Sequence, residues 1–324
     1  MYTYEELLEK FGLSMEKEKY AGKPAELYEP ISYMMELGGK RLRPVLLLMA
    51  CDAFGGDIEE AMPAALAVEM FHNFTLVHDD IMDGASLRRG KDTIWNIWGE
   101  DTAILVGDTM FAMSIEYLLK TNHARVNEML ATFLKGAKEV CEGQQLDMNF
   151  EEADNTTIPD YLGMIRLKTA VLLANSLKLG AIIANAKKED IENIFEFGIN
   201  IGLSFQLKDD LLDVYGSVNK FGKMPGGDIL SDKKTFLLLK TLTIGEEADK
   251  KTIESYIGEG KEDPEQKIMD ITAIYSKLNI DKITVTEMER HFERAEYHIG
   301  LVSLPDDKKA ELLSLAQKMM YRNQ

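Results

Sequence analysis

Apolar residues recur at spacings of three and four along nearly the whole chain, and this helical periodicity is the strongest constraint on its fold. The clearest case is the segment Ile191 to Leu212, where apolar side chains on all sides predict a central, largely buried helix. Alternating runs of β-branched residues are missing from the sequence, and only 8 of its 324 residues are proline. The sequence therefore predicts an all-α fold with helices of roughly 10–25 residues.

No low-complexity linker divides the chain. Gly38-Gly39 predicts the end of a helix over residues 30–37, because glycine tolerates the left-handed cap, and residues 216–228 predict a long loop. We therefore expect residues 1–324 to form one large helical domain, although the length would also allow two smaller ones.

The composition excludes several classes of partner. The 37 Lys and Arg against 55 Asp and Glu give a net charge of −18, whereas nucleic acids and anionic membranes require a basic surface. The first ten residues are acidic where a secretory signal is basic, and no uncharged apolar stretch reaches the ~20 residues of a membrane span. Two cysteines are too few for a disulfide framework. We expect a protein of the reducing cytoplasm.

An acidic cluster at residues 79–83 (DDIMD) is the most informative motif. In a helix, Asp79 and Asp83 lie one turn apart on one face, about 6 Å between Cβ atoms, where like charges destabilise the helix slightly. A single DDxxD in an acidic protein can be a solvated helix face. Here the cluster follows the apolar stretch Ala64 to Val77, and a solvated face would carry charges along that stretch as well.

A second cluster, Asp209-Asp210-Leu211-Leu212-Asp213, again follows an apolar helix, with Gln206 on the same face. Solvation does not explain two such clusters near the ends of buried helices. If both faced one cavity, cations would be required, because unpaired buried charges cost several kcal/mol each. Hard oxygen ligands favour Mg²⁺ or Mn²⁺, and Mg²⁺ commonly completes its shell with water and phosphate. The pair predicts a site for several Mg²⁺ ions and a polyphosphate.

Basic residues gather next to these motifs. Surface solvation explains any one of them, but groups flanking a magnesium-type cluster indicate an anionic substrate, since Arg and Lys both bind phosphate. The segment around Lys223 lacks the Ser or Thr that follows a P-loop lysine, which disfavours nucleotide chemistry. The candidate cations are Lys40, Arg41 and Arg43, then Arg88, Arg89 and Lys91, and finally Lys168, Lys223 and Lys233.

Taken in order, these motifs resemble the trans-isoprenyl diphosphate synthases (farnesyl and geranylgeranyl diphosphate synthases) over nearly the whole chain. The matching motifs are Gly39-Lys40-Arg41-Leu42-Arg43-Pro44, His72, the cluster 79–83 with Arg88-Arg89-Gly90, Gly143-Gln144 with Asp147, Lys168-Thr169, Phe205-Gln206 with the cluster 209–213, and Gly222-Lys223 with Asp228 and Lys233.

The resemblance implies an isoprenoid-synthase helical bundle around a central cavity, a homodimer, and Mg²⁺, as three ions with bound diphosphate, with Mn²⁺ as the alternative. The implied reaction is head-to-tail (1′-4) condensation of isopentenyl diphosphate with dimethylallyl, geranyl or farnesyl diphosphate.

The resemblance also assigns roles to single residues. Asp79, Asp83 and Asp209 would ligate the metal, and Asp80, Asp210, Asp213 and Asp228 would support them. Arg88, Lys168, Lys223 and Lys233 would neutralise the allylic diphosphate, and Lys40, Arg43, His72 and Arg89 would hold isopentenyl diphosphate. Thr169 and Gln206 would face the developing allylic cation.

Product length depends on the residues upstream of Asp79 if the product grows past them. Phe74 lies about 7.5 Å and Phe71 about 12 Å along the helix from Asp79, and Thr75 lies one turn away. One aromatic at the fifth position upstream and a small residue at the fourth resemble archaeal-type geranylgeranyl synthases, which indicates a C20 product. If Phe71 shortens the product, a mixture of C20 with C15 farnesyl diphosphate results. A role of both phenylalanines in core packing is the alternative to a role in setting product length.

Two other functions share part of the pattern. A class I terpene cyclase also uses DDxxD, but it needs no second basic site and usually has an Asn/Ser/Glu pattern in place of the second cluster. A non-catalytic subunit of a heteromeric synthase tends to lose acidic residues, and both clusters are intact here.

Overall fold

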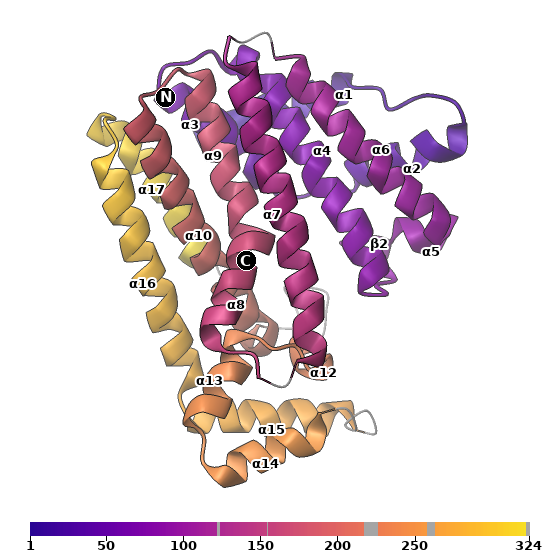
Figure 1. The fold of residues 1–324 in the computed structure, drawn as a ribbon, viewed down its shortest axis with the longest axis vertical. Coiled ribbons are helices and arrows are strands. Elements are labelled where there is room, and N and C mark those ends of the chain that lie inside the picture. Colours follow the sequence, from indigo (N-terminus) through magenta and orange to yellow (C-terminus); the bar gives the residue numbers. More distant parts are fainter. Residues whose placement is uncertain (122–123, 154, 217–225, 258–262, 322–324) are drawn as a thin grey trace. The chain divides into compact units, whose positions relative to one another are not determined.

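The computed structural model describes the chain except for residues 122–123, 154, 217–225, 258–262 and 322–324, and it is built almost wholly of helices (Figure 1). The predicted all-α fold is confirmed. The described residues form two compact units: one comprises Met1–Ala137, Asn175–Phe195 and Val302–Leu312, and the other comprises Lys138–Ala174, Glu196–Leu301 and Leu313–Gln324. We call them unit 1 and unit 2; the single domain expected over residues 1–324 stays a prediction.

Unit 1 begins with a series of helices joined by short turns. Its elements are α1 (Tyr4–Lys17), α2 (Ala25–Glu36), α3 (Leu42–Ala53), α4 (Ile58–Met82), β1 (Leu87–Arg88), β2 (Lys91–Asp92), α5 (Ile94–Trp98) and α6 (Glu100–Leu119). The helix expected to end at Gly38-Gly39 is α2, and both glycines have positive φ, 78° and 131°.

Unit 2 contains most of the later helices. The elements that follow α6 are α7 (Val126–Glu152), α8 (Ile158–Ile165), the π-helical segment η1 (Arg166–Ala170), α9 (Val171–Ile183), α10 (Lys188–Tyr215), α12 (Gly227–Leu230), α13 (Phe236–Ile244), α14 (Glu247–Tyr256), α15 (Pro264–Lys277), α16 (Ile280–Leu301) and α17 (Asp306–Tyr321). Helices α7, α9, α10 and α17 contribute residues to both units.

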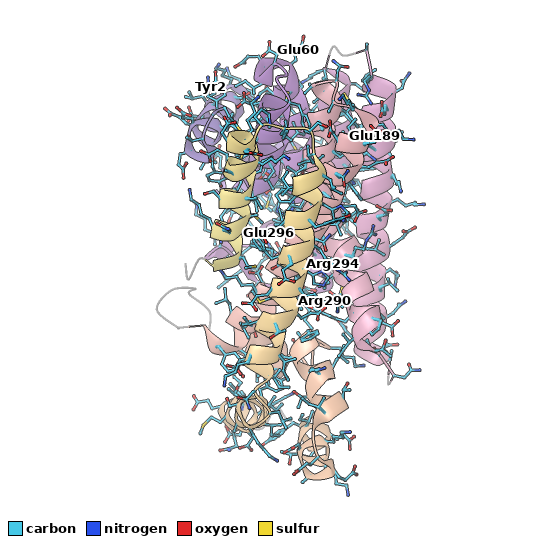
Figure 2. All side chains as sticks on the ribbon, turned by 90° about the vertical axis from the view of Figure 1, so that its left-hand side faces the viewer. Tyr2, Glu60, Glu189, Arg290, Arg294 and Glu296 are labelled. Carbon is cyan, nitrogen blue, oxygen red and sulfur yellow. The ribbon has the colours of Figure 1, made fainter. Side chains whose placement is uncertain are left out.

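Amphipathic patterning explains most of these helices, and α16 is an example. Figure 2 labels Arg290, Arg294 and Glu296 on its exposed side, whereas Phe292 and Ile299 of the same helix are buried. Helix α10 is different, because buried apolar residues surround it, as the sequence predicted. It reaches the second acidic cluster at its C-terminal end.

A short β-hairpin, with two residues in each strand, departs from the all-α pattern. Strands β1 and β2 pair antiparallel, with Leu87 opposite Asp92 and Arg88 opposite Lys91. Arg89 and Gly90 form the turn with φ of 53° and 77°, the left-handed conformation that such a tight turn requires. The hairpin places Arg88 and Arg89 just beyond the end of α4.

Glycines allow η1 to lie very close to two neighbouring helices. A Cβ added at Gly143 of α7 would stand 2.3 Å from the Lys168 backbone nitrogen, and one at Gly202 of α10 would stand 2.5 Å from Ala170 Cα. Short π-helical segments are frequent at functional sites, and this one carries Lys168 and Thr169.

Helix α6 is long and apolar enough, by length and composition, to cross a membrane, and 39% of its most apolar window is buried. A core helix of a soluble protein satisfies the same criterion, so the predicted absence of a membrane span stays a prediction.

Candidate active site

The first acidic cluster lies at the C-terminal end of α4, where Asp79 and Asp83 are one turn apart as predicted. Asp83 caps the helix, and its backbone N–H donates to the Asp79 carbonyl at 2.8 Å. The last turn of α4 contains no basic residue. Carboxylates at this end of a helix face the negative pole of its dipole, so the cluster is electrostatically unfavourable unless cations compensate it.

The middle aspartate of this cluster has its own partner. Asp80 is buried, and Arg88 Nε donates to its two carboxylate oxygens at 2.8 and 2.9 Å. The guanidinium also lies 3.6 Å from Asp79. Asp79 is partly exposed and Asp83 is exposed. Arg88 therefore fixes Asp80, while the two carboxylates predicted to ligate metal face outward.

The loop between α2 and α3 holds Arg89 against its backbone. Arg89 donates to the Gly38 carbonyl, and a Cβ on Gly39 would stand 2.9 Å from the Arg89 guanidinium. The φ of 131° favours glycine at position 39, and the missing side chain leaves room for the Arg89 guanidinium. Lys40 lies on the same loop, and its carbonyl accepts a hydrogen bond from Tyr4 Oη at 2.6 Å.

A buried ion pair anchors the end of this loop. Arg41 bonds Glu69 of α4 and the Met35 carbonyl. Next along the chain, Arg43 lies 3.2 Å from Nε2 of His72. Burial, followed by the charge of Arg43, holds the pKa of His72 well below its usual range, so the neutral ring accepts the guanidinium proton at Nε2.

Unit 1 therefore brings together three of the four residues predicted to hold isopentenyl diphosphate, Arg43, His72 and Arg89, whereas Lys40 is placed only by its backbone on the loop between α2 and α3. Arg43, Arg89 and Arg88 all contribute to lowering the pKa of His72, which shows how closely these positive charges gather. Such a concentration of Arg side chains is suited to bidentate binding of phosphate. The four residues are Lys40, Arg43, His72 and Arg89.

The predicted chain-length residues lie in an aromatic cluster. Phe71 is fully buried, and its ring centroid is 5.3 Å from Phe74, 5.9 Å from Phe111 and 5.4 Å from Phe133. Phe74 is only partly buried, and Thr75 donates to the His72 carbonyl at 2.8 Å. The contacts of Phe71 are those of a packed core residue, and the roles of Phe111 and Phe133 in this cluster were not predicted.

The second acidic cluster, in unit 2, repeats the pattern of the first. Asp210 is buried and accepts hydrogen bonds from Tyr161 Oη and, at 3.0 Å, from Gln206 Nε2, while Asp209 is exposed. Burial raises the pKa of Asp210 to about 6. Again the middle aspartate is held by protein donors and the first faces outward. Tyr161 was not predicted.

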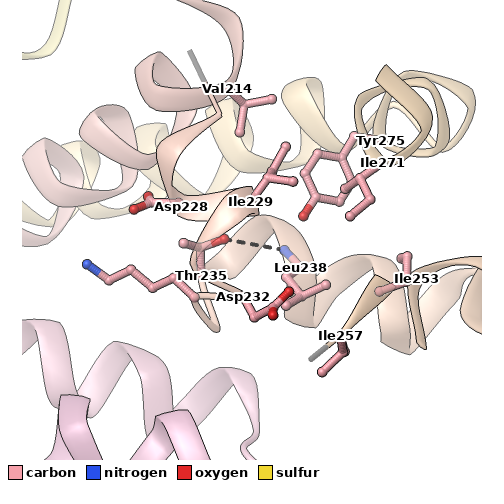
Figure 3. A pocket seen from close by; sticks show the side chains of 11 residues that line it. Val214, Asp228, Ile229, Asp232, Thr235, Leu238, Ile253, Ile257, Ile271 and Tyr275 are labelled. Atoms are coloured by element: carbon pink, nitrogen blue, oxygen red, sulfur yellow. Dashed lines mark hydrogen bonds between the residues drawn. The ribbon is translucent and has the colours of Figure 1, made fainter. Parts of the chain in front are cut away.

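Asp228 adds a further carboxylate beside Asp213. Its backbone N–H donates to Asp213 Oδ2 at 2.9 Å. Burial raises the pKa of Asp228 to about 7, and the charges of Asp213, Asp210 and Asp147 add to the effect, while Lys233 opposes it. Asp228 is one of the residues that line a cavity of about 10 Å³, which has room for about one water molecule; Figure 3 shows these side chains.

The π-helical segment supplies the remaining predicted groups of unit 2. Lys168 Nζ donates to Asp147 Oδ2 at 2.6 Å, and Thr169 donates to Gln206 Oε1 at 3.0 Å. The Gly143-Gln144 motif is explained by its position on α7, where Gly143 lets η1 approach. Lys223 lies outside the described residues.

The residues present fit a divalent cation. Their donors are carboxylate oxygens, the ligands that Mg²⁺ prefers, and in unit 2 the charges of Asp213, Asp210 and Asp147 add to the burial that raises the pKa of Asp228. Within the described part of the chain, no group of three or more His, Cys, Asp or Glu side chains is arranged so that it could hold a metal ion by itself. Mg²⁺ commonly takes one or two carboxylates and completes its shell with water and phosphate, which suits these sparse sets.

Comparisons with known proteins point to one family. A sequence model of the polyprenyl synthetase family matches residues 24–275. The chain is 36% identical over 305 residues to a geranylgeranyl diphosphate synthase of Methanosarcina mazei, covering 93% of this chain and 91% of that protein.

Solved structures are similar over the full length. A crystal structure of a geranylgeranyl pyrophosphate synthase matches with a TM-score of 0.95 at 38% identity, covering 99% of both chains. A polyprenyl synthase from Caulobacter crescentus, crystallised with calcium and isoprenyl diphosphate, matches with a TM-score of 0.89 at 28% identity, covering 99% of this chain and 97% of that one. The predicted fold class, the helical bundle of isoprenyl synthases, is confirmed.

Replacing Gly143 by alanine should destabilise the fold by about 1–3 kcal/mol, because the added methyl group meets backbone atoms of η1. Thermal unfolding measures the loss. The matched control is Gly163→Ala on α8, where nothing lies within 4 Å of the added Cβ. Equal melting temperatures for the two variants would contradict the proposed close contact.

Replacing Asp228 by asparagine should stabilise the metal-free protein at pH 8 by about 1–3 kcal/mol, since one pKa unit corresponds to about 1.4 kcal/mol. The pKa of Asp228 is raised to about 7, so the folded state binds more protons than the unfolded state, and stability falls as pH rises from 4 to 7. The gain, measured by urea unfolding with EDTA, should shrink at pH 5.

The control substitution for this prediction should change stability in the opposite direction. The hydrogen bond from Lys277 lowers the pKa of Asp249, so Asp249→Asn should lower stability at pH 8. If Asp228→Asn also lowers stability there, the raised pKa is wrong.

Proposed function

The chain belongs to the polyprenyl synthetase family, and on this premise we propose that it condenses isopentenyl diphosphate with allylic diphosphates. The product we propose is geranylgeranyl diphosphate, the compound named in the similar proteins of Methanosarcina mazei and of the matching crystal structure. One observation carries the proposal: two helices end in carboxylate clusters, and each cluster has Arg or Lys beside it.

We propose that the outer carboxylates Asp79, Asp83 and Asp209 hold magnesium, and that Asp80, Asp210, Asp213 and Asp228 support them. Magnesium, when bound, would offset the charge that develops on the departing diphosphate. The support comes from the donor chemistry and from the calcium in the Caulobacter crescentus structure. We propose that three metal ions bind together with the diphosphate, and that the metal is Mg²⁺ rather than Mn²⁺.

The basic side chains divide between the two substrates in this proposal. Lys40, Arg43, His72 and Arg89 would hold isopentenyl diphosphate, with the neutral His72 fixing the Arg43 guanidinium through its hydrogen bond. Arg88, Lys168, Lys223 and Lys233 would bind the allylic diphosphate. Lys168 would exchange its contact with Asp147 for the phosphate oxygens.

Carbon–carbon bond formation requires that the allylic cation meet the isopentenyl double bond before it meets water. We propose that Thr169 and Gln206 stabilise this cation with their oxygen atoms, since the hydrogen bond between them fixes both side chains. No side chain is needed as the final base, because the departed diphosphate can take the proton.

We also propose a homodimer that works in the cytoplasm as a single catalytic domain. The support for a dimer is the outer face of α6, where Ile104, Leu105 and Leu119 are 40%, 59% and 55% exposed. A second copy of the chain would cover these apolar side chains.

Purified protein with Mg²⁺, labelled isopentenyl diphosphate and an allylic primer should form prenyl diphosphates of up to C20. Asp79→Asn and Asp209→Asn should each reduce turnover by roughly 10² or more, since each removes one proposed metal ligand. Asp307→Asn, an exposed acid on α17, is the control and should keep full activity. Cyclised hydrocarbon as the product, or near-normal activity of the first two variants, would contradict the proposal.

Phe74→Ala should lengthen the product beyond that of the wild type. Phe74 is the less buried of the two phenylalanines, so its removal should open space above Phe71 with little loss of packing. Chromatography of the dephosphorylated products measures the change. An unchanged product distribution would exclude Phe74 as the limit to chain length.

A further inference from the structure

Lys267 of α15 is a buried charge outside every role assigned so far. It is only 2% exposed, and its Nζ donates to Asp232 Oδ1 at 2.6 Å. Burying an ammonium group costs several kcal/mol unless a partner compensates, and apolar replacements of such pairs are often no less stable. The pair therefore calls for an explanation other than stability.

The partner, Asp232, follows the C-cap residue Ser231 of the short helix α12 and has an unusual backbone conformation. Its φ of 56° is left-handed, and its backbone N–H donates to the Ile229 carbonyl at 3.3 Å. Asparagine, aspartate and glycine are the residues that adopt this conformation most readily. Figure 3 shows Asp228 and Asp232 on different sides of this segment.

Other contacts seat the same segment on α15. A Cβ at Gly226 would stand 2.8 Å from Ile268, so the backbone there lies directly against the helix. Ile229 belongs to the apolar cluster that also contains Ile271 of α15. The ion pair of Lys267 is thus the polar part of a contact whose remainder is apolar.

The residues that follow Asp232 lead to the second acidic cluster. The Lys233 backbone N–H donates to the Asp228 carbonyl at 2.9 Å, and the Lys233 charge acts on both Asp228 and Asp210. Lys234 donates to the Ala153 carbonyl just beyond α7. Lys233 is therefore flanked by two residues, each tied to a different helix or its end.

We propose that the Lys267–Asp232 pair is a positioning device that fixes Lys233 and Asp228 at the second acidic cluster. This inference rests on the proposed function, in which Lys233 and Asp228 help to bind the allylic diphosphate and its metal. Lys267 touches no substrate; it acts by holding the turn at Asp232. Of the three consecutive residues 232–234, Asp232 then contacts α15, Lys233 lies at the second acidic cluster, and Lys234 bonds the backbone just beyond α7.

Lys267→Met should weaken the binding of inorganic diphosphate in the presence of Mg²⁺ by about five- to tenfold, measured by calorimetry on the full chain. The KM for the allylic primer should rise, while the KM for isopentenyl diphosphate stays within about twofold, because its proposed ligands all belong to unit 1. The matched control is Lys277→Met on the same helix, where the lysine pairs with Asp249 but is 52% exposed.

A second variant separates positioning from stability. In Lys267→Met/Asp232→Asn neither side chain is charged, and asparagine keeps the left-handed turn, so the protein should melt near the wild type. It should still bind magnesium and diphosphate weakly. Wild-type binding by this double variant would show that the pair only stabilises the fold, and would overturn the inference.

The same measurements distinguish the two proposals from each other. If the wild type forms no prenyl diphosphate, the proposed function is wrong. The role of Lys267 can still be tested in that case, by comparing how tightly the wild type and Lys267→Met bind diphosphate in the presence of magnesium. If the wild type is active and Lys267→Met matches Lys277→Met in both binding and KM, the inference alone fails.

Discussion

Carboxylates crowded at the C-terminal ends of α4 and α10 are the constraint on which the rest of the site depends. Each end carries three aspartates within five residues and no basic residue in its last turn. The helix dipole is negative at that end, so neither the helix nor the like charges favour the arrangement. Nearby cations, and polar groups that hold the aspartates in place, must therefore accompany each cluster.

The two units solve this problem in the same way with different side chains. In each cluster the second aspartate is buried and bonded to protein donors: Asp80 to Arg88, and Asp210 to Tyr161 and Gln206. The first aspartate of each cluster remains more exposed. The held aspartates anchor the helix ends that carry the more exposed carboxylates, and those exposed carboxylates are the proposed metal ligands.

The sequence was sufficient to predict the helical fold and to recognise the motifs, because both depend on the spacing of residues that are close together in the chain. The apolar residues around α10 and the one-turn separation of Asp79 and Asp83 follow from 3.6 residues per turn. Tyr161, Phe111 and Lys267 could not be found this way, because each acts on residues distant in the chain. A tyrosine on an apolar helix or a lysine on a helix of mixed charge carries no sign of its partner, and the π-helical turn at Lys168 has no local signature.

The central proposal, that both acidic clusters bind divalent metal and diphosphate, is tested most directly by anomalous diffraction from crystals grown with Mn²⁺ and inorganic diphosphate. The account predicts manganese peaks within coordination distance of Asp79 or Asp83 and of Asp209, each in contact with diphosphate. Manganese at one cluster only, or diphosphate bound without any metal contact to either cluster, would contradict it.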